Sequence, residues 1–156
     1  HVRRVAMDRR SVLKVAGVVS AAATALVAMP RLAMAAYTEK AFKSKAGADA
    51  LQNAYGANAT TPSDQVKLKA PDIAENGAVV PVEVETDMNA ESIAILIDGN
   101  PSPLALTADI PAGTKGLVKT RCRMGKTTNV TAVVKSGGKL YTASKEVKVT
   151  IGGCGG

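Results

Sequence analysis

The 156-residue sequence predicts an all-β protein, an immunoglobulin-like antiparallel β-sandwich preceded by a cleaved signal peptide and a short N-terminal helix and followed by a flexible C-terminal tail. Two observations support the sandwich. From Gln65 onward, short segments alternate apolar and polar residues, a pattern typical of strands with one packed and one solvated face. Turn residues separate these segments about every eight to twelve residues with no helical pattern between them, as in immunoglobulin-type sandwiches.

Residues 1–35 are predicted to form a twin-arginine-type signal peptide. The pair Arg9-Arg10 precedes an uncharged run from Val15 to Met29, and Ala33-Met34-Ala35 supplies the small residues of a cleavage site. A transmembrane anchor is the alternative, but this run of about fifteen residues is shorter than the roughly 20 that a spanning helix needs. We therefore expect cleavage, export to the periplasm and no membrane anchor in the mature protein.

Residues 36–64 are expected to form a helix and a linker. Thr38 can cap a helix whose apolar residues follow helical spacing to about Tyr55. Gly47 weakens this helix, and Gly56 is a plausible stop. Small and polar residues over 58–64 predict the linker.

The predicted sandwich covers residues 65–151. Its inward-facing positions are expected to be Val66, Leu68, Val80, Val82, Val84, Val118, Thr120, Cys122, Met124, Val130, Ala132, Val134, Val147, Val149 and Ile151. Turns are predicted at Asp98–Pro101 and Ser136–Gly138. Pro81 cannot donate a backbone hydrogen bond, which places it at a sheet edge or a bulge.

The segment from Ser92 to Ile97 differs from the other strands because both of its faces are apolar. Such a strand needs cover on both sides. We expect the second sheet to cover one face and a helix or another subunit to cover the other.

The last five residues, 152–156, are expected to form a mobile arm. Gly152 and Gly153 precede Cys154, and Gly155 and Gly156 follow it. Glycine tolerates nearly any backbone conformation, so this segment has little reason to keep one. Its composition suits a thiol that must enter another protein's pocket, and Cys154 is the expected site of covalent attachment.

Composition excludes several other classes of function. The net charge is +7, but +5 of it precedes Ala36, so the body is nearly neutral, and its few aromatic residues cannot form a base-stacking surface. The only histidine is His1, which cleavage would remove, so no Cys–His pair or histidine metal site is expected. We expect no catalytic residue, cofactor or metal, and no binding of nucleic acid.

Cys122 leaves the pairing of Cys154 open. A disulfide between them would staple the arm down, whereas Cys122 on an apolar face is also typical of a small packed hydrophobe. An intermolecular disulfide through Cys154 is a further alternative. The terminal Gly-Gly could instead belong to a cytosolic carrier activated by ATP, but the export signal argues against that.

Two motifs, together with the signal, resemble the SoxY family, the sulfur-carrier subunits of the thiosulfate-oxidising Sox system. They are Gly152–Gly156 and the stretch Pro71-Asp72-Ile73-Ala74-Glu75-Asn76-Gly77 that leads into Val79–Val82. The resemblance covers essentially the whole mature chain. It implies a carrier that is no enzyme itself and that holds thiosulfate-derived intermediates on Cys154.

The resemblance also implies partners. These are a SoxZ-like subunit forming a heterodimer, a c-type cytochrome complex that joins thiosulfate to the cysteine, a hydrolase that releases sulfate, and a sulfane dehydrogenase. Ile93–Ile97 and Pro81 are candidates for the surface shared with the SoxZ-like subunit.

Two other hypotheses remain at this point. One is a structural or adhesion sandwich whose terminal cysteine links two chains. The other is a thiol oxidoreductase that uses Cys122 and Cys154 as a redox pair.

Overall fold

In this computed structural model, residues 39–150 are described; the predicted signal peptide, the expected cap at Thr38, and the residues from Ile151 onward lie outside them. The described residues belong to one compact unit. Its elements are α2 (Gly47–Tyr55), β1 (Thr60–Pro62), β2 (Val66–Lys69), β3 (Ile73–Ala74), β4 (Val80–Thr86), β5 (Ser92–Ile97), β6 (Leu104–Asp109), β7 (Gly116–Cys122), β8 (Thr128–Ser136) and β9 (Lys139–Val149).

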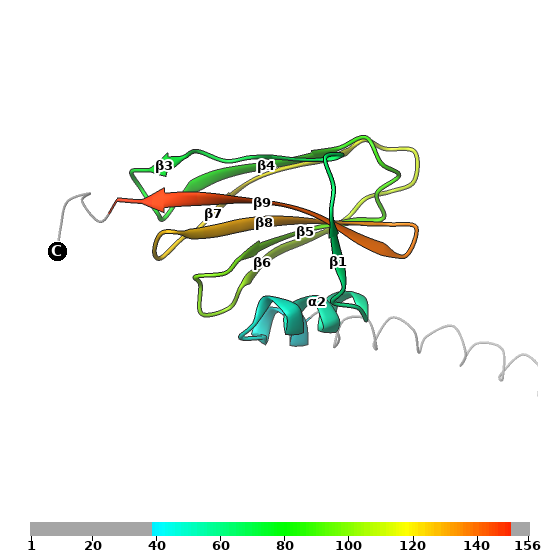
Figure 1. Ribbon diagram of the computed structural model, residues 1–156, viewed down its shortest axis with the longest axis horizontal. Helices are drawn as coiled ribbons and strands as arrows, with labels where there is room; N and C mark the ends of the chain where they lie inside the picture. The colour runs from blue at the N-terminus through cyan, green and yellow to red at the C-terminus, as the bar shows by residue number, and fades with distance from the viewer. Residues whose placement is uncertain (1–38, 151–156) are drawn as a thin grey trace, which may run out of the picture. The chain divides into compact units, whose positions relative to one another are not determined.

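The strands form two sheets, which confirms the predicted sandwich (Figure 1). The larger sheet has the order β1-β9-β8-β5-β6, and β3 pairs with the far end of β9; the smaller sheet has the order β2-β4-β7. Most pairs are antiparallel, as predicted. The short strands β1 and β3, however, run parallel to β9, and these two pairs were not predicted.

The core between the sheets is built from the alternating residues of the predicted strands. Val80, Val82 and Val84 of β4 are at most 2% exposed and pack in one cluster with Ile93, Ile95 and Ile97 of β5. The outward positions of β4 carry Pro81 and two glutamates. The period-two pattern therefore has the predicted cause, which is one packed and one solvated face.

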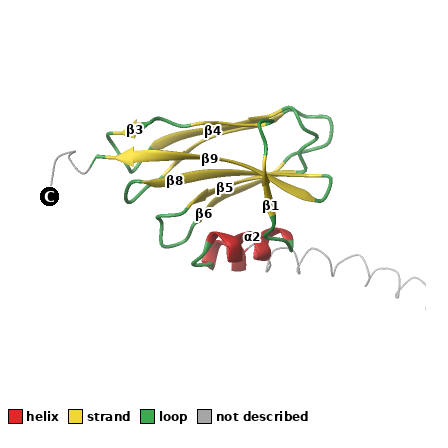
Figure 2. Cartoon of the chain, in the orientation of Figure 1, coloured by secondary structure: helices red, strands yellow, loops and turns green. Residues whose placement is uncertain are grey.

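Helix α2 covers the other face of the larger sheet (Figures 1 and 2). Ala50 and Leu51 pack with Ala94 and Leu96 of β5 in a second buried cluster. The hydroxyl groups of Tyr55 and Ser92 share a hydrogen bond of 2.9 Å, and burial is the main cause that raises the pKa of Tyr55. The helix thus provides the second cover that the two-sided apolar strand β5 requires.

This packing corrects one expectation. All six residues of β5 are buried within the chain itself, so Ile93–Ile97 is not a surface for another subunit. The apolar pattern of β5 is compatible with a helix or a subunit as the cover, and helix α2 is the one that the structure shows.

The N-terminal helix differs in detail from its prediction. Residues 39–43 and 47–55 are helical, but 44–46 are not. Ser44 donates a hydrogen bond from its hydroxyl group to the Lys40 carbonyl and accepts one from the Asn53 side chain, so the interruption is stabilised locally. The predicted stop is confirmed, since Gly56 follows α2 with a φ of 70° that favours glycine.

Three short strands were missed. Thr60–Pro62 forms β1 inside the segment expected to be a linker, where it pairs with Leu140–Thr142 of β9. Leu104–Asp109 and Ile73–Ala74 were not assigned because neither shows a clear alternation of apolar and polar residues.

Pro81 lies within the central strand of the small sheet, but β2 pairs with β4 only from Glu83 onward, so that side of β4 is open at the proline.

We expect Leu51→Ala to lower the free energy of unfolding by about 2–4 kcal/mol, because it leaves a cavity between α2 and the sheet. Chemical denaturation followed by circular dichroism measures this. Leu117→Ala is the matched control, since Leu117 is 39% exposed and should cost little. Equal losses in the two variants would contradict the packing of α2 described above.

Candidate functional site

The residues predicted to carry the function, Gly152, Gly153, Cys154, Gly155 and Gly156, lie outside the described part of the chain. The structure does describe the segment that immediately precedes them, which is the end of β9 followed by Thr150. We call this segment and its surroundings the arm base, comprising the end of β9 with Thr150 (147–150), β3 with its flanking residues (71–79), and Thr127.

Backbone hydrogen bonds hold the end of β9 on the side of β3. The Lys148 amide donates to the Asp72 carbonyl at 2.9 Å, and the Thr150 amide donates to the Ala74 carbonyl at 3.2 Å. On the other side, the Val149 amide donates to the Thr127 hydroxyl at 2.9 Å. The chain is therefore bonded from two directions up to the last described residue.

Gly77 allows the segment after β3 to pack closely against β9. The Met124 amide donates to the Gly77 carbonyl at 2.7 Å. A Cβ atom on Gly77 would lie 2.4 Å from the Met124 carbonyl oxygen and 2.9 Å from Cγ1 of Val149. Relieving this contact would require the Met124 backbone to move, so this position requires glycine. The turn beside it is closed by the Asn76 side chain, which accepts a hydrogen bond from the Ala78 amide at 2.9 Å.

An ion pair adds to the same anchor. Lys145 of β9 lies 2.9 Å from the Asp72 carboxylate and also donates to the Ala70 carbonyl at 2.6 Å. The hydrogen bond from Lys145 lowers the pKa of Asp72. The Asp72 side chain is largely exposed, so this pair contributes little energy and chiefly fixes geometry. The motif Pro71–Gly77 of the sequence analysis thus has a structural role, which is to hold the arm base.

Cys122 lies at the end of β7, at the same end of the sandwich as the arm base. It is a free thiol, only 6% exposed, and it packs in the core between the sheets. Burial raises its pKa, so it stays protonated at neutral pH and is a poor partner for thiol exchange. This environment supports the interpretation of Cys122 as a packed hydrophobe and disfavours both the staple to Cys154 and the redox pair.

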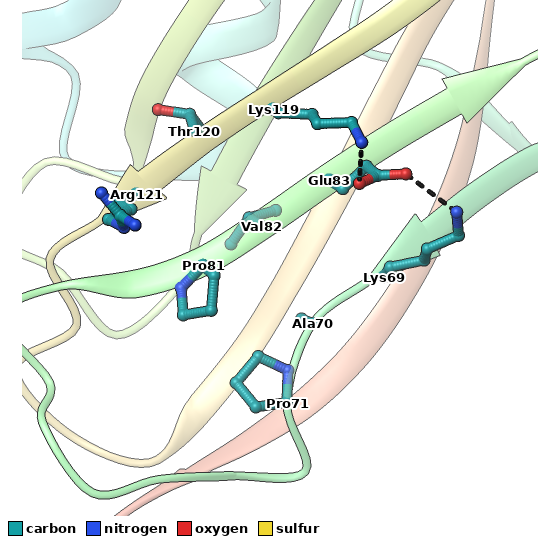
Figure 3. Close-up of a pocket in the computed structure, with 9 residues that line it drawn as sticks. All are labelled: Lys69, Ala70, Pro71, Pro81, Val82, Glu83, Lys119, Thr120 and Arg121. Atoms are coloured by element: carbon teal, nitrogen blue, oxygen red, sulfur yellow. Dashed lines mark hydrogen bonds and ion pairs between the residues drawn. The ribbon is translucent and has the colours of Figure 1, made fainter.

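The outer face of the small sheet carries a shallow groove of about 690 Å³. Figure 3 shows Pro71 and Pro81 on facing sides of it, with Arg121 near one end and Glu83 near the other. Lys69 and Lys119 each contact the Glu83 carboxylate, at 2.8 and 3.0 Å, and their hydrogen bonds lower its pKa. The Arg121 guanidinium makes no ion pair with any residue between 39 and 150.

Two classes of feature are not found among residues 39–150. No group of three or more histidine, cysteine, aspartate or glutamate residues in this part of the chain could hold a metal ion. No helix in the same part is long and apolar enough to cross a membrane.

Comparison with known proteins gives a consistent result. The sequence profile of a family described as "Sulfur oxidation protein SoxY" matches residues 51–154. The solved structure of the sulfur carrier protein SoxY from Chlorobium limicola f thiosulfatophilum is 45% identical, with a TM-score of 0.61 over 66% of this chain and 94% of that chain.

A superoxide reductase (neelaredoxin) from Ignicoccus hospitalis is 19% identical, with a TM-score of 0.50 over 55% of this chain and 80% of that chain. Likeness at this level concerns the fold alone. A search of curated proteins gives no match.

We expect Gly77→Ala to loosen the end of β9, because its Cβ would collide with the Met124 carbonyl. Hydrogen exchange should accelerate at the amides of Met124, Lys148 and Thr150 by about tenfold or more. The control is Gly125→Ala, whose Cβ would meet no heavy atom within 4 Å. Unchanged exchange in Gly77→Ala would show that Gly77 does not hold the arm base.

We expect the two thiols to react at very different rates with iodoacetamide. Cys122 is buried with a raised pKa, so its alkylation in the folded protein should be slower than that of a free cysteine by about a hundredfold or more. Peptide mass spectrometry after timed quenching measures the rate at each site, and the protein unfolded in urea is the control. Fast labelling of Cys122 in the folded protein would contradict its described burial.

Proposed function

The chain belongs to the SoxY family of sulfur oxidation proteins, and from this membership we propose that it holds thiosulfate-derived intermediates covalently on Cys154 and presents them to the Sox enzymes. A role as a carrier protein in sulfur oxidation follows from the family itself.

The observation that carries the proposal is the anchoring of the chain as far as Thr150. The Thr127 hydroxyl and the carbonyl groups of Asp72 and Ala74 accept hydrogen bonds from the amides of the last described residues. Only Ile151 and two glycines separate Thr150 from Cys154. A thiol on a glycine-rich segment that starts from a fixed point suits a carrier, since it can move while its origin stays in place.

The proposed loading step forms one sulfur–sulfur bond. The Cys154 thiol loses its proton, its sulfur joins the outer sulfur of thiosulfate, and two electrons pass to a c-type cytochrome complex. A hydrolase then adds water, releases sulfate and leaves a persulfide on Cys154. A sulfane dehydrogenase oxidises the remaining sulfur where that enzyme is present.

In this scheme the chain is acted upon and does not catalyse. An unperturbed thiol near pKa 8.5 is only a few per cent thiolate at neutral pH, which suits a group that is activated by the enzymes that modify it. The sequence has no histidine after His1 to serve as a local base.

We further propose that the protein works in the periplasm as a heterodimer with a SoxZ-like subunit. The twin-arginine-type pattern in residues 1–35 supports export. Fractionation of cells expressing the full sequence tests this. Replacing Arg9-Arg10 by two lysines should leave the precursor in the cytoplasm, and undiminished export of that variant would contradict the proposed route.

We expect Cys154→Ser to abolish loading, because oxygen in place of sulfur cannot form the disulfide-like bond. The purified protein is incubated with thiosulfate and the cytochrome complex, and adducts are located by peptide mass spectrometry. Cys122→Ala is the control and should load like the wild type. Adducts on another residue, or full turnover in Cys154→Ser, would refute the proposal.

Non-reducing electrophoresis of freshly isolated protein separates the carrier from the adhesion hypothesis. The carrier should be mostly monomeric with respect to covalent links. A structural protein joined through Cys154 should run almost entirely as a covalent dimer.

A further inference from the structure

The length of the proposed arm limits where a partner enzyme can bind. Cys154 lies four positions after Thr150, and at roughly 3.3–3.6 Å per position the chain between them spans at most about 13–14 Å. Active sites are usually concave and enclose their substrates. An enzyme that takes Cys154 into such a site must therefore lie against the arm base itself.

The arm base carries large apolar side chains that are exposed and not buried in the core. Ile73 is 57% exposed and Val79 is 50% exposed, and both belong to the segment that packs on the end of β9. The third large exposed hydrophobic residue in the described part of the chain, Leu117, pairs with Glu85 at the opposite end of β7. Single exposed hydrophobic residues are ordinary, but here two of three lie beside one functional segment.

The groove on the small sheet extends this apolar surface. Pro71 and Pro81 line it, and they stand two residues before Ile73 and two residues after Val79. Figure 3 shows the two prolines facing each other with Arg121 beyond them. Exposed apolar side chains and a hollow next to them are what a protein interface offers to an inserted side chain.

Charge on this surface is predominantly positive. At the far end of the groove Glu83 is neutralised by Lys69 and Lys119. At the end nearer the arm base, Arg121 makes no ion pair within residues 39–150, so three cationic side chains and one carboxylate line the groove. A partner surface with apolar groups flanked by aspartate or glutamate would complement this arrangement.

We propose that Ile73, Val79, Pro71, Pro81 and Arg121 form the docking surface on which the enzymes that load and unload Cys154 bind. This inference rests on the proposed carrier function and assigns the partner a chemistry, an apolar rim flanked by carboxylates at its active-site entrance. Two observations indicate this surface: the short distance from Thr150 to Cys154, and the exposed apolar and cationic side chains of the arm base and the adjoining groove.

The test compares Ile73→Ser/Val79→Ser with Leu117→Ser in the loading of Cys154 by the cytochrome complex, using thiosulfate as substrate. All three side chains are exposed, so neither variant should disturb folding, which circular dichroism checks. The double variant should lower kcat/KM for the carrier about tenfold, mainly by raising KM. Leu117→Ser should stay within about twofold of the wild type.

Arg121→Gln provides a second, independent readout. It should slow loading at low salt and flatten the dependence of kcat/KM on ionic strength, because it removes a charge that steers the encounter. Lys139→Gln is the matched control, since Lys139 begins β9 at the end of the sandwich remote from Thr150. Equal salt dependence in both variants would count against the docking surface.

The outcomes separate this inference from the function on which it rests. A wild-type protein that is never loaded on Cys154 overturns the carrier function. A wild-type protein that is loaded, with Ile73→Ser/Val79→Ser no slower than Leu117→Ser, overturns the docking surface alone. Loss of the heterodimer in the double variant, measured by size-exclusion chromatography, would assign the surface to the partner subunit and also overturn it.

Discussion

The pairing of β9 on both of its edges is the constraint on which the rest of the molecule depends. It hydrogen-bonds to β8 on one edge, and on the other to β1 near its start and to β3 at its end. Strand ends normally fray because their outer hydrogen bonds have little else to support them. Here the contacts of Asp72, Ala74 and Thr127 continue beyond the ladder with β8 to Thr150. The proposed arm consequently starts from a defined point.

Much of the fold could be predicted from the sequence because burial on one face forces alternation. The alternation of Val80, Val82 and Val84 predicted strand β4, and Gly56 predicted the end of helix α2. The short parallel strands could not be predicted, since Ile73–Ala74 is too short to show any period and depends on a partner about 75 residues away. The exposed residues Thr60–Pro62 carry no burial pattern at all. For β5 the sequence showed the need for a second cover, and only the structure identified α2 as that cover.

The candidate site, too, could be predicted from the sequence only in part. A cysteine among glycines is visible in the sequence because composition alone makes it unusual. The parts that hold its base were not visible as such. Gly77 appeared in a family motif, but its need for a missing Cβ depends on the Met124 carbonyl and Val149, which only the fold brings together. Thr127 lies in a loop and carries no local signal. Burial of Cys122 matched the expectation from its alternating neighbours.

The position of α2 also decides which broad face of the sandwich stays open. By covering the outer face of β5 and β8, the helix closes one broad side of the sandwich to any second sandwich domain. The small sheet remains bare, and β6 and β7 end their sheets without a neighbouring strand in the described part of the chain. The outer face of the small sheet and the free edges of β6 and β7 are therefore what the sandwich leaves accessible. Helix α2 thus gives the sandwich one covered and one open broad face, and the groove lies on the open one.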